Sequence, residues 1–450
     1  MIKSDTLYNF IEDLFPKCRS ITGKNTLETL EYIKKIVPIN IKSVETGTKV
    51  FDWEVPEEWN ISDAYISNSN GDKIIDFKNN NLHVLNYSQP VDTKISFKEL
   101  KKHLYYISEF PDWIPYRTSY YNKKWGFCLS YNQYKKMEKN GDDYIYNVKI
   151  DSSLKNGNLN YGEFLIKGKS SEEILFSTYI CHPSMCNDNL TGVSVTTYLA
   201  KYLQKINTQY SYRFLFIPET IGSITWLSLN RDKLDNIKGG IVNTCMGDNG
   251  KIQYKKSRIG NSLIDRIVSK VLKDTKNNSN VFNYDNLQDY KIREFAPVGS
   301  DERQYCSQGI NLPVGCLTRT PYGEFDEYHT SADNLKFISK EHLFDSYKFL
   351  KKCIFYLENN KICRNLYTMC ELNLGKRGLY TQVGGVAGLK GNEFNPLIFK
   401  WILNYSDGKT DLLTISDKSN LDFLDIVNAY KMLLEKKLIN VVGDKTNATN

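Results

Sequence analysis

The stretch STYICHPSMCNDNLTG, residues 177–192, begins as an apolar strand and ends at the start of a helix. The polar loop between them contains His182 and Asp188. Asp188 could serve only as the N-cap of the helix that follows, since aspartate is favoured there. Imidazole and carboxylate are also ligands that Zn²⁺ accepts. The stretch is therefore either an ordinary connection or one side of a metal site.

Four near-continuous apolar runs in the middle of the chain predict strands that are buried on both faces. They cover residues 173–180, 212–218, 240–246 and 312–317. Segments with apolar residues at helical spacing alternate with them, at 190–203, 223–234, 262–272 and 340–357. Alternating strands and helices are typical of an α/β domain, and we predict this fold class.

The regions on either side follow different patterns. Residues 7–36 have apolar positions at helical spacing, interrupted at 21–23, which predicts two helices joined by a turn. From about residue 44, turn residues separate short alternating runs at 49–55, 64–67, 73–77 and 82–85. Such runs predict a small β-rich unit. After residue 365, helical patterns at 395–403 and 411–439 and a short apolar end predict a winged helix.

Composition limits the class of protein. A chain of 450 residues is too long for one compact core of typical size. The net charge is +7, from 59 basic and 52 acidic residues, and residues 370–450 carry ten basic against nine acidic side chains. Because phosphate binding demands an excess of positive charge, we do not expect a nucleic-acid partner.

Cysteine usage and hydropathy bear on the compartment. The ten cysteines form no CxxC pair, which favours reduced thiols and a cytoplasmic protein. The N-terminal residues 1–15 carry charges among their apolar positions, which is typical of an amphipathic helix and not of a signal peptide. No window approaches the ~18 apolar residues of a membrane span, so we expect no membrane contact.

Polar residues follow each of the four predicted strands. In open α/β sheets, ligands bind outside the carboxyl ends of the strands. His182 and Asp188 follow the first strand, and the later strands are followed by Glu219, Asp248 and His329. The chain has only five histidines, and two of them fall in these loops beside carboxylates. Helix caps and loop polar groups remain the alternative interpretation.

Five motifs in order give this chain a family resemblance. They are His182, DNLTG at 188–192, FIPETIGS at 216–223, VGSDERQY at 298–305 and YHTSADN at 328–334. The series resembles metallopeptidase family 28, the zinc aminopeptidases of the bacterial leucyl type. Within that family it looks most like aminopeptidase-like proteins with an inserted β domain and a C-terminal winged helix.

The resemblance implies an architecture. The main domain is expected to be a phosphorylase/hydrolase-like zinc-exopeptidase sheet with helices on both faces, formed by residues 1–40 and 140–365. The inserted β-rich domain is expected at 41–139, and the winged-helix domain at 366–450.

The resemblance also implies roles for individual residues. His182, Asp188 and His329 match the family's metal ligands, and Glu219 matches its general base, which takes a proton from metal-bound water. Two positions depart from the pattern: Thr220 replaces a ligand glutamate, and Cys245 replaces a ligand aspartate. We therefore expect one zinc ion and not two, since three protein ligands and one open position suffice for catalysis.

Asp248 and several further residues have open roles. Asp248 could be a fourth metal ligand, a group that orients His182, an anchor for a substrate amine, or a turn residue. Arginine binds carboxylates with two parallel hydrogen bonds, so a substrate carboxylate could be held by an arginine. The candidates are Arg117, Arg258 and Arg303, although a structural ion pair is the favoured alternative for each. Tyr120, with Tyr121 and Trp125, would narrow the cleft and favour small substrates.

Three functions follow from these interpretations. The leading one is a zinc-dependent aminopeptidase that acts on a small peptide or aminoacyl substrate. The second is an altered metal-binding or regulatory protein whose winged helix contacts protein or nucleic acid. The third is another amide or acyl-transfer reaction, for instance on an amino sugar, because fold alone does not decide chemistry. For the C-terminal domain we expect a protein partner or a second copy of the chain.

Overall fold

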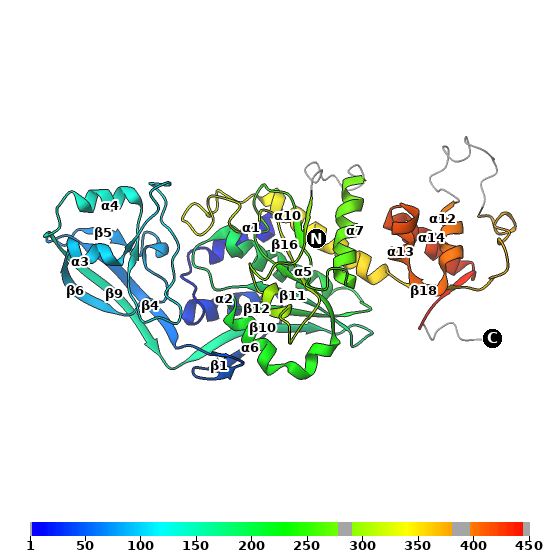
Figure 1. Ribbon diagram of the computed structural model, residues 1–450, viewed down its shortest axis with the longest axis horizontal. Helices are drawn as coiled ribbons and strands as arrows, with labels where there is room; N and C mark the ends of the chain where they lie inside the picture. Colours follow the sequence, from blue (N-terminus) through cyan, green and yellow to red (C-terminus); the bar gives the residue numbers. More distant parts are fainter. Residues whose placement is uncertain (1, 278–289, 380–396, 444–450) are drawn as a thin grey trace. The chain divides into compact units, whose positions relative to one another are not determined.

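The computed structural model describes residues 2–277, 290–379 and 397–443 (Figure 1). The chain divides into two compact units: residues 1–265 with 289–351, and residues 266–288 with 352–450. No helix in these described ranges has both the length and the apolar character needed to cross a membrane.

An eight-stranded sheet forms the centre of the first unit. Its strand order is β1-β10-β12-β11-β13-β16-β14-β15. The middle strands β12 (Ser211–Ile217), β11 (Glu173–Tyr179), β13 (Ile237–Asn243) and β16 (Val314–Thr318) are parallel to one another. The outer strands are β1 (Asn40–Glu45), β10 (Asn158–Ile166), β14 (Gln253–Lys255) and β15 (Lys291–Arg293). Every residue of β11 and β12 is buried, as their apolar runs predicted.

Helices pack on this sheet as the sequence predicts, and the α/β fold class is confirmed. The two N-terminal helices are α1 (Ser4–Leu14) and α2 (Lys24–Lys34), and α2 contacts β1 and β10. Helix α5 (Gly192–Leu203) contacts β11, β12 and β13, while α6 (Ile221–Leu229) contacts β10. The remaining helical segments are α7 (Leu263–Asn277), α9 (Glu302–Tyr305), α10 (Lys340–Asn359), η3 (Cys186–Thr191) and η4 (Arg231–Asn236).

Between β1 and β10 the chain forms a second, four-stranded sheet. Its antiparallel strands have the order β5 (Lys73–Asp76), β4 (Glu58–Ser67), β9 (Ile145–Lys155) and β6 (Val91–Ser96). Short pairs β2–β3 (Lys49–Val50, Trp53–Glu54) and β7–β8 (Leu104–Tyr105, Phe127–Cys128) accompany it, with α3 (Phe97–Leu100), η2 (Lys101–His103) and α4 (Tyr131–Glu138). We call the segment from β2 to β9 the insert.

One predicted β run in the insert is not a strand. Residues 82–85 lie in and after η1 (Asn81–His83), a short 3₁₀ helix. The Asn80 side chain accepts a hydrogen bond from the backbone N–H of Leu82 and caps this turn. Asparagine side chains often form hydrogen bonds with the backbone of neighbouring residues. Here this bond stabilises a turn, although the alternation of apolar and polar residues predicts a strand.

The second unit has the elements of a winged helix. A three-stranded antiparallel sheet joins β18 (Asp407–Asp411), β17 (Ile362–Asn365) and β19 (Ile439–Val441). Its helices are α12 (Leu397–Tyr405), α13 (Leu412–Ser419) and α14 (Phe423–Glu435), and η5 (Gly375–Arg377) precedes them. The predicted run 411–439 is thus two helices, and Asp411 and Asp422 cap their N-termini. Residues 395 and 396 of the predicted helix 395–403 lie outside the described residues.

Candidate metal centre

The loop that follows β11 carries the first two predicted ligands. His182 lies three residues after the strand, and Asp188 lies in η3, the turn that leads into α5; both are buried. The hydroxyl of Tyr179, the last residue of β11, donates a hydrogen bond to Asp188 Oδ1. The strand end therefore fixes the direction of the Asp188 carboxylate.

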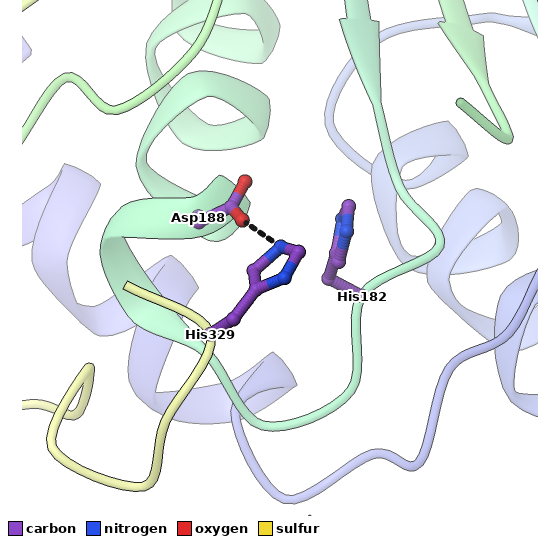
Figure 2. Close-up of side chains that lie close together, drawn as sticks. All are labelled: His182, Asp188 and His329. Carbon is purple, nitrogen blue, oxygen red and sulfur yellow. Dashed lines mark ion pairs between the residues drawn. The ribbon is translucent and has the colours of Figure 1, made fainter. Parts of the chain in front are cut away.

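His329 reaches the same place from a distant segment. Its Nε2 atom lies 3.0 Å from Asp188 Oδ2, as the dashed line in Figure 2 marks. One candidate ligand atom each from His182, Asp188 and His329 can be chosen so that all lie within 4.8 Å of one another. In Figure 2 the two imidazoles and the carboxylate gather around one point. We call these three residues the metal cluster.

The cluster fits a divalent cation chemically. Asp188 Oδ2 and His329 Nε2 are buried and lie 3.0 Å from each other, and neither forms a hydrogen bond with any other group of the described residues. Burial, together with His329 and Arg19, lowers the pKa of His182 to about 4 despite the opposing effect of Asp188. A neutral imidazole has the free lone pair that metal binding requires. Burial raises the pKa of Asp188, but His182, His329 and the Tyr179 hydroxyl outweigh it and bring the value to about 2.

Asp333 joins the two loops that carry the cluster. Its carboxylate accepts hydrogen bonds from three consecutive backbone N–H groups, with nitrogen–oxygen distances of 3.2 Å from Cys186, 2.6 Å from Asn187 and 2.9 Å from Asp188. Asp333 itself lies four residues after His329 in the sequence. One carboxylate thus connects the Asp188 turn to the His329 loop.

Glu219 lies beside the cluster at the end of β12. Its Oε2 atom is 3.8 Å from His182 Nε2. Burial raises the pKa of Glu219 well above its usual range, and the nearby carboxylates of Asp301 and Asp188 raise it further. A carboxyl group with a raised pKa is suited to accept and return protons near neutral pH.

The next residue, Thr220, turns toward different partners. It has a positive φ of 64°, and its N–H donates to Asp301 Oδ1 at 2.7 Å. Its hydroxyl accepts from Arg303 Nη2 at 2.8 Å, and Arg303 Nη1 donates to the Gly299 carbonyl at 2.8 Å. Arg303 therefore lies next to the Glu219 segment and binds the Thr220 hydroxyl.

One tyrosine of the insert, Tyr116, reaches the cluster, and a second, Tyr120, contacts Tyr116. The ring of Tyr116 meets those of His182 and His329 edge-on, with centroid distances of 5.4 and 5.0 Å. The Tyr116 N–H donates to the His329 carbonyl at 2.7 Å, and the hydroxyls of Tyr116 and Tyr120 lie 2.7 Å apart. Pro115 and Thr330 form an antiparallel bridge. The insert is thus attached to the loop that carries His329.

Asp248 lies outside this arrangement. Its carboxylate accepts hydrogen bonds from Asn187 Nδ2, the Gly250 N–H, and the N–H and hydroxyl of Thr320. Within the described part of the chain, the metal cluster does not include it. These bonds make Asp248 a support for Asn187, the neighbour of Asp188. Cys245 is fully buried, and its sulfur accepts from the Thr244 hydroxyl at 3.4 Å.

The other predicted arginines are exposed. Arg258 Nη1 donates to Asn311 Oδ1 at 3.0 Å, and the Arg117 carbonyl accepts from the Asn86 N–H at 2.9 Å. Within the described part of the chain, neither guanidinium contacts the metal cluster. The structure thus groups Arg303 and Tyr120 with Glu219 and the cluster, but not Arg117 or Arg258.

Sequence reasoning did not single out Asp333, Asp301 or Tyr116. Asp301 and Asp333 lie inside the motifs VGSDERQY and YHTSADN. Their place in these motifs is the feature of the sequence that could have identified them as site residues. Tyr116 lies in the insert, about 65 residues before His182, and no spacing rule connects the two. Only the fold brings it to the site.

Comparison with known proteins places the chain in a family. The model of a domain of unknown function, DUF4910, matches residues 8–360. The chain belongs to the DUF4910 family. A winged helix-turn-helix model matches residues 361–441 and confirms the predicted C-terminal fold.

A curated relative covers nearly the whole chain. It is a Clostridium acetobutylicum protein named "Putative polysaccharide biosynthesis protein with aminopeptidase-like domain". The two are 52% identical over 436 residues, which is 97% of this chain and 96% of the relative. A crystal structure from the same organism, described as a "putative peptidase", has a TM-score of 0.88 at 50% identity and covers 98% of this chain and 96% of its own.

More distant structures share the fold. A zinc aminopeptidase from Bacillus subtilis has a TM-score of 0.55 at 14% identity, covering 79% of this chain and 95% of its own. A peptidase M28 precursor from Shewanella amazonensis has a TM-score of 0.52 at 12% identity, covering 79% and 93%. The first unit of this DUF4910 chain therefore has an aminopeptidase-like fold.

Proposed function

We propose that this DUF4910 protein is a zinc-dependent hydrolase that cleaves an N-terminal residue or another small amide. The observation that carries the proposal is the metal cluster with the Glu219 carboxylate 3.8 Å from one of its imidazoles. The aminopeptidase-like fold supports it. A mere binding protein would have no use for a proton acceptor at that position.

His182, Asp188 and His329 would hold one zinc ion. When bound, zinc polarises the substrate carbonyl and lowers the pKa of a water molecule toward neutrality. Glu219 would accept a proton at its Oε2 atom and return it to the leaving amine. Thr220 and Cys245 stand at the positions where a second ion would need ligands. Thr220 is bonded to Arg303 and Asp301, and Cys245 to Thr244, so neither residue favours a second ion. We leave Asp248 out of the ligand set, since hydrogen bonds occupy both of its oxygens.

Tyr120 and Arg303 are our candidates for substrate contact. The Tyr120 hydroxyl contacts that of Tyr116, which packs against the cluster, and Arg303 binds Thr220, the residue that follows Glu219. We drop Arg117 and Arg258 from this role. The attachment of the insert through Tyr116 supports a preference for small substrates.

The name of the curated relative mentions polysaccharide biosynthesis. That supports an amide carried by an amino sugar as an alternative substrate to a peptide. Both substrates require the same chemistry at the cluster, namely attack of water on an amide carbonyl.

The Glu219→Gln variant tests the proposal. It removes the proton acceptor but keeps the shape of the side chain, so zinc content should stay at the wild-type level while hydrolysis falls by at least about 10²-fold. The assay is a panel of aminoacyl anilides, dipeptides and N-acylated amino sugars. If zinc-loaded wild-type protein hydrolyses no member of the panel, the hydrolase proposal is wrong.

A regulatory role is the second candidate, and Thr220 and Cys245 are the observations that favour it. In that case zinc would bind, no substrate would be hydrolysed, and the C-terminal winged helix would contact another protein or a second copy of the chain. Size measurement of the zinc-loaded and zinc-free protein separates the two functions, because only the regulatory role requires the assembly to depend on zinc.

A further inference from the structure

The connection from β12 to α6 is very short. Only Pro218, Glu219 and Thr220 separate the strand from the helix. The two elements also approach closely, because a Cβ atom added to Gly222 in α6 would lie 2.8 Å from Pro218 Cδ. Glu219, the proposed proton acceptor, therefore lies in a sharp reversal that leaves the backbone little space to relax.

This reversal is a γ-turn centred on Thr220. Its φ is 64° and its ψ is −76°, and the Ile221 N–H donates to the Glu219 carbonyl at 2.8 Å. A γ-turn with positive φ is rare and strained, and the β-branched side chain of threonine makes positive φ still less favourable. Such strain persists only where surrounding contacts hold it, and it is commonly found at functional sites.

The carboxylate of Asp301 is one contact that holds the turn. Its Oδ1 atom accepts from the Thr220 N–H at 2.7 Å and from the Ser223 hydroxyl at 2.8 Å. Aspartate just before a helix commonly caps that helix. Asp301 directly precedes α9, yet its side chain forms no capping bond there. The buried carboxylate instead binds the turn that carries Glu219.

A second contact to the turn comes from the same segment. Arg303 Nη2 donates to the Thr220 hydroxyl at 2.8 Å. The segment is itself attached to the central sheet, because the Tyr305 hydroxyl lies 2.9 Å from Ser177 Oγ in β11. Asp301 and Arg303 therefore bind both polar donor and acceptor groups that Thr220 offers on this side, its N–H and its hydroxyl, from a position fixed to the sheet.

We propose that Asp301, assisted by Arg303, is a positioning residue that holds the strained turn and so keeps the Glu219 carboxylate beside His182. Asp301 acts through the backbone of Thr220 and not by touching the substrate. The residue at position 220 then serves through its N–H and hydroxyl, which explains a role for threonine there without a second metal ion. The inference rests on the proposed function, since it takes Glu219 as the proton acceptor.

Kinetics of the zinc-loaded full chain test this inference, with any substrate of the panel that the wild type hydrolyses. Asp301→Ala removes both hydrogen bonds of the carboxylate. Because the strain at Thr220 is comparable to the contribution of these bonds, kcat should fall at least about tenfold while KM and zinc content stay at the wild-type level. Asp301→Asn keeps an oxygen acceptor, so its kcat should stay within about threefold of the wild type.

Asp265→Ala is the matched control for a merely structural effect. Asp265 and Asp301 are each 1% exposed, and Asp265 accepts from the Ser257 N–H at 2.8 Å and the Tyr254 hydroxyl at 2.9 Å. Its loss should lower stability in urea unfolding to a similar extent but leave kcat unchanged. A similar fall in kcat for this control would assign the effect of Asp301→Ala to stability and overturn the inference.

Thr220→Val decides the question if Asp301→Ala does not fold. Valine keeps the shape and the N–H of threonine but loses the hydroxyl that Arg303 binds. Its kcat should fall at least about threefold with an unchanged KM, as the loss of one hydrogen bond to the turn implies. A wild-type kcat in Thr220→Val, or in a folded Asp301→Ala, would show that these contacts do not position Glu219.

Crystal structures of the zinc-loaded wild type and the folded variant give a readout that needs no substrate. In the variant, the φ of Thr220 should leave the positive region, and Glu219 Oε2 should move away from its position 3.8 Å from His182 Nε2. If this movement is seen but the wild type hydrolyses nothing, Asp301 holds the turn and only the hydrolase proposal fails. If the turn and Glu219 stay in place without the Asp301 carboxylate, the inference is wrong.

Discussion

The carboxylate of Asp333 has the most consequential contacts at the residue scale. It binds three consecutive N–H groups and so holds the Asp188 turn against the loop of His329. Groups that orient metal ligands commonly matter for affinity almost as much as the ligands do. The arrangement of the cluster thus depends on a residue outside the cluster itself.

We predict that Asp333→Ala lowers zinc affinity by about 10- to 100-fold, because the two loops lose their common anchor. Competition with a chromophoric chelator measures this affinity. Asp345→Ala in α10 is a matched control, since Asp345 forms an ion pair with Lys348 instead of binding the cluster loops. Equal zinc affinity in wild type and Asp333→Ala would show that the anchor is dispensable.

Tyr116 gives a second prediction. Tyr116→Leu removes the edge-on contact with both imidazoles and should lower zinc affinity, whereas Tyr116→Phe keeps the ring and should bind zinc like the wild type. The same chelator competition measures both variants. A loss of affinity in the phenylalanine variant would instead assign the effect to the hydroxyl pair with Tyr120.

The sequence could predict the cluster, but not its support. His182, Asp188, Glu219 and His329 each follow a strand, and parallel strands bring their carboxyl ends to one edge. Asp333 accepts hydrogen bonds from backbone N–H groups, which every residue except proline carries. The partners of Asp333 therefore cannot be predicted from the pattern of side chains.

At the scale of single elements, β12 contains a charge within its apolar run. Arg213 is buried between the carboxylates of Glu163 in β10 and Glu173 in β11, with Nε 2.6 Å from Glu173 Oε2. The two ion pairs raise the pKa of Arg213 although burial opposes them. The three side chains thus connect neighbouring strands β10, β12 and β11 across the sheet.

We predict that Arg213→Leu lowers the free energy of unfolding by about 3–5 kcal/mol, because two buried carboxylates lose their partner. Urea unfolding followed by circular dichroism measures this loss. Arg231→Leu, at an exposed position, should change stability by less than about 0.5 kcal/mol. A similar small change for Arg213→Leu would contradict the buried ion-pair account.

Elements with a long apolar run could be predicted, whereas one of the short runs could not. The strands β11, β12, β13 and β16 were predicted to within a few residues, because burial on both faces leaves an unmistakable apolar pattern. The run at 82–85 is too short for its periodicity to distinguish a strand from a turn. The hydrogen bond between the Asn80 side chain and the Leu82 N–H favours the turn.

At the scale of the whole molecule, the chain has two compact units with separate stabilising contacts. Within the second unit, Asp411 caps α13 and forms paired hydrogen bonds with Arg266, at 2.9 and 3.0 Å. Burial raises the pKa of Asp411, but Arg266, Thr414 and Asn360 outweigh it and bring the value to about 2.

The lowered pKa predicts how the second unit responds to acid. Ionised Asp411 stabilises the fold above its unfolded pKa of 3.8, and this contribution is lost as pH falls from about 4 to about 2. Calorimetry of the full chain should show a lower melting temperature for Asp411→Ala at pH 7, with a smaller difference near pH 2. A difference that stays constant over this range would contradict the assignment.

The central claim is that His182, Asp188 and His329 together bind one zinc ion. Zinc analysis of the full chain tests this claim most directly. Protein dialysed against buffered zinc should contain one equivalent by plasma mass spectrometry, and a crystal should show one anomalous zinc peak between these three side chains. His329→Ala should lose that peak. A wild-type chain that retains no zinc, or a His182→Ala/His329→Ala variant that retains a full equivalent, would contradict the claim.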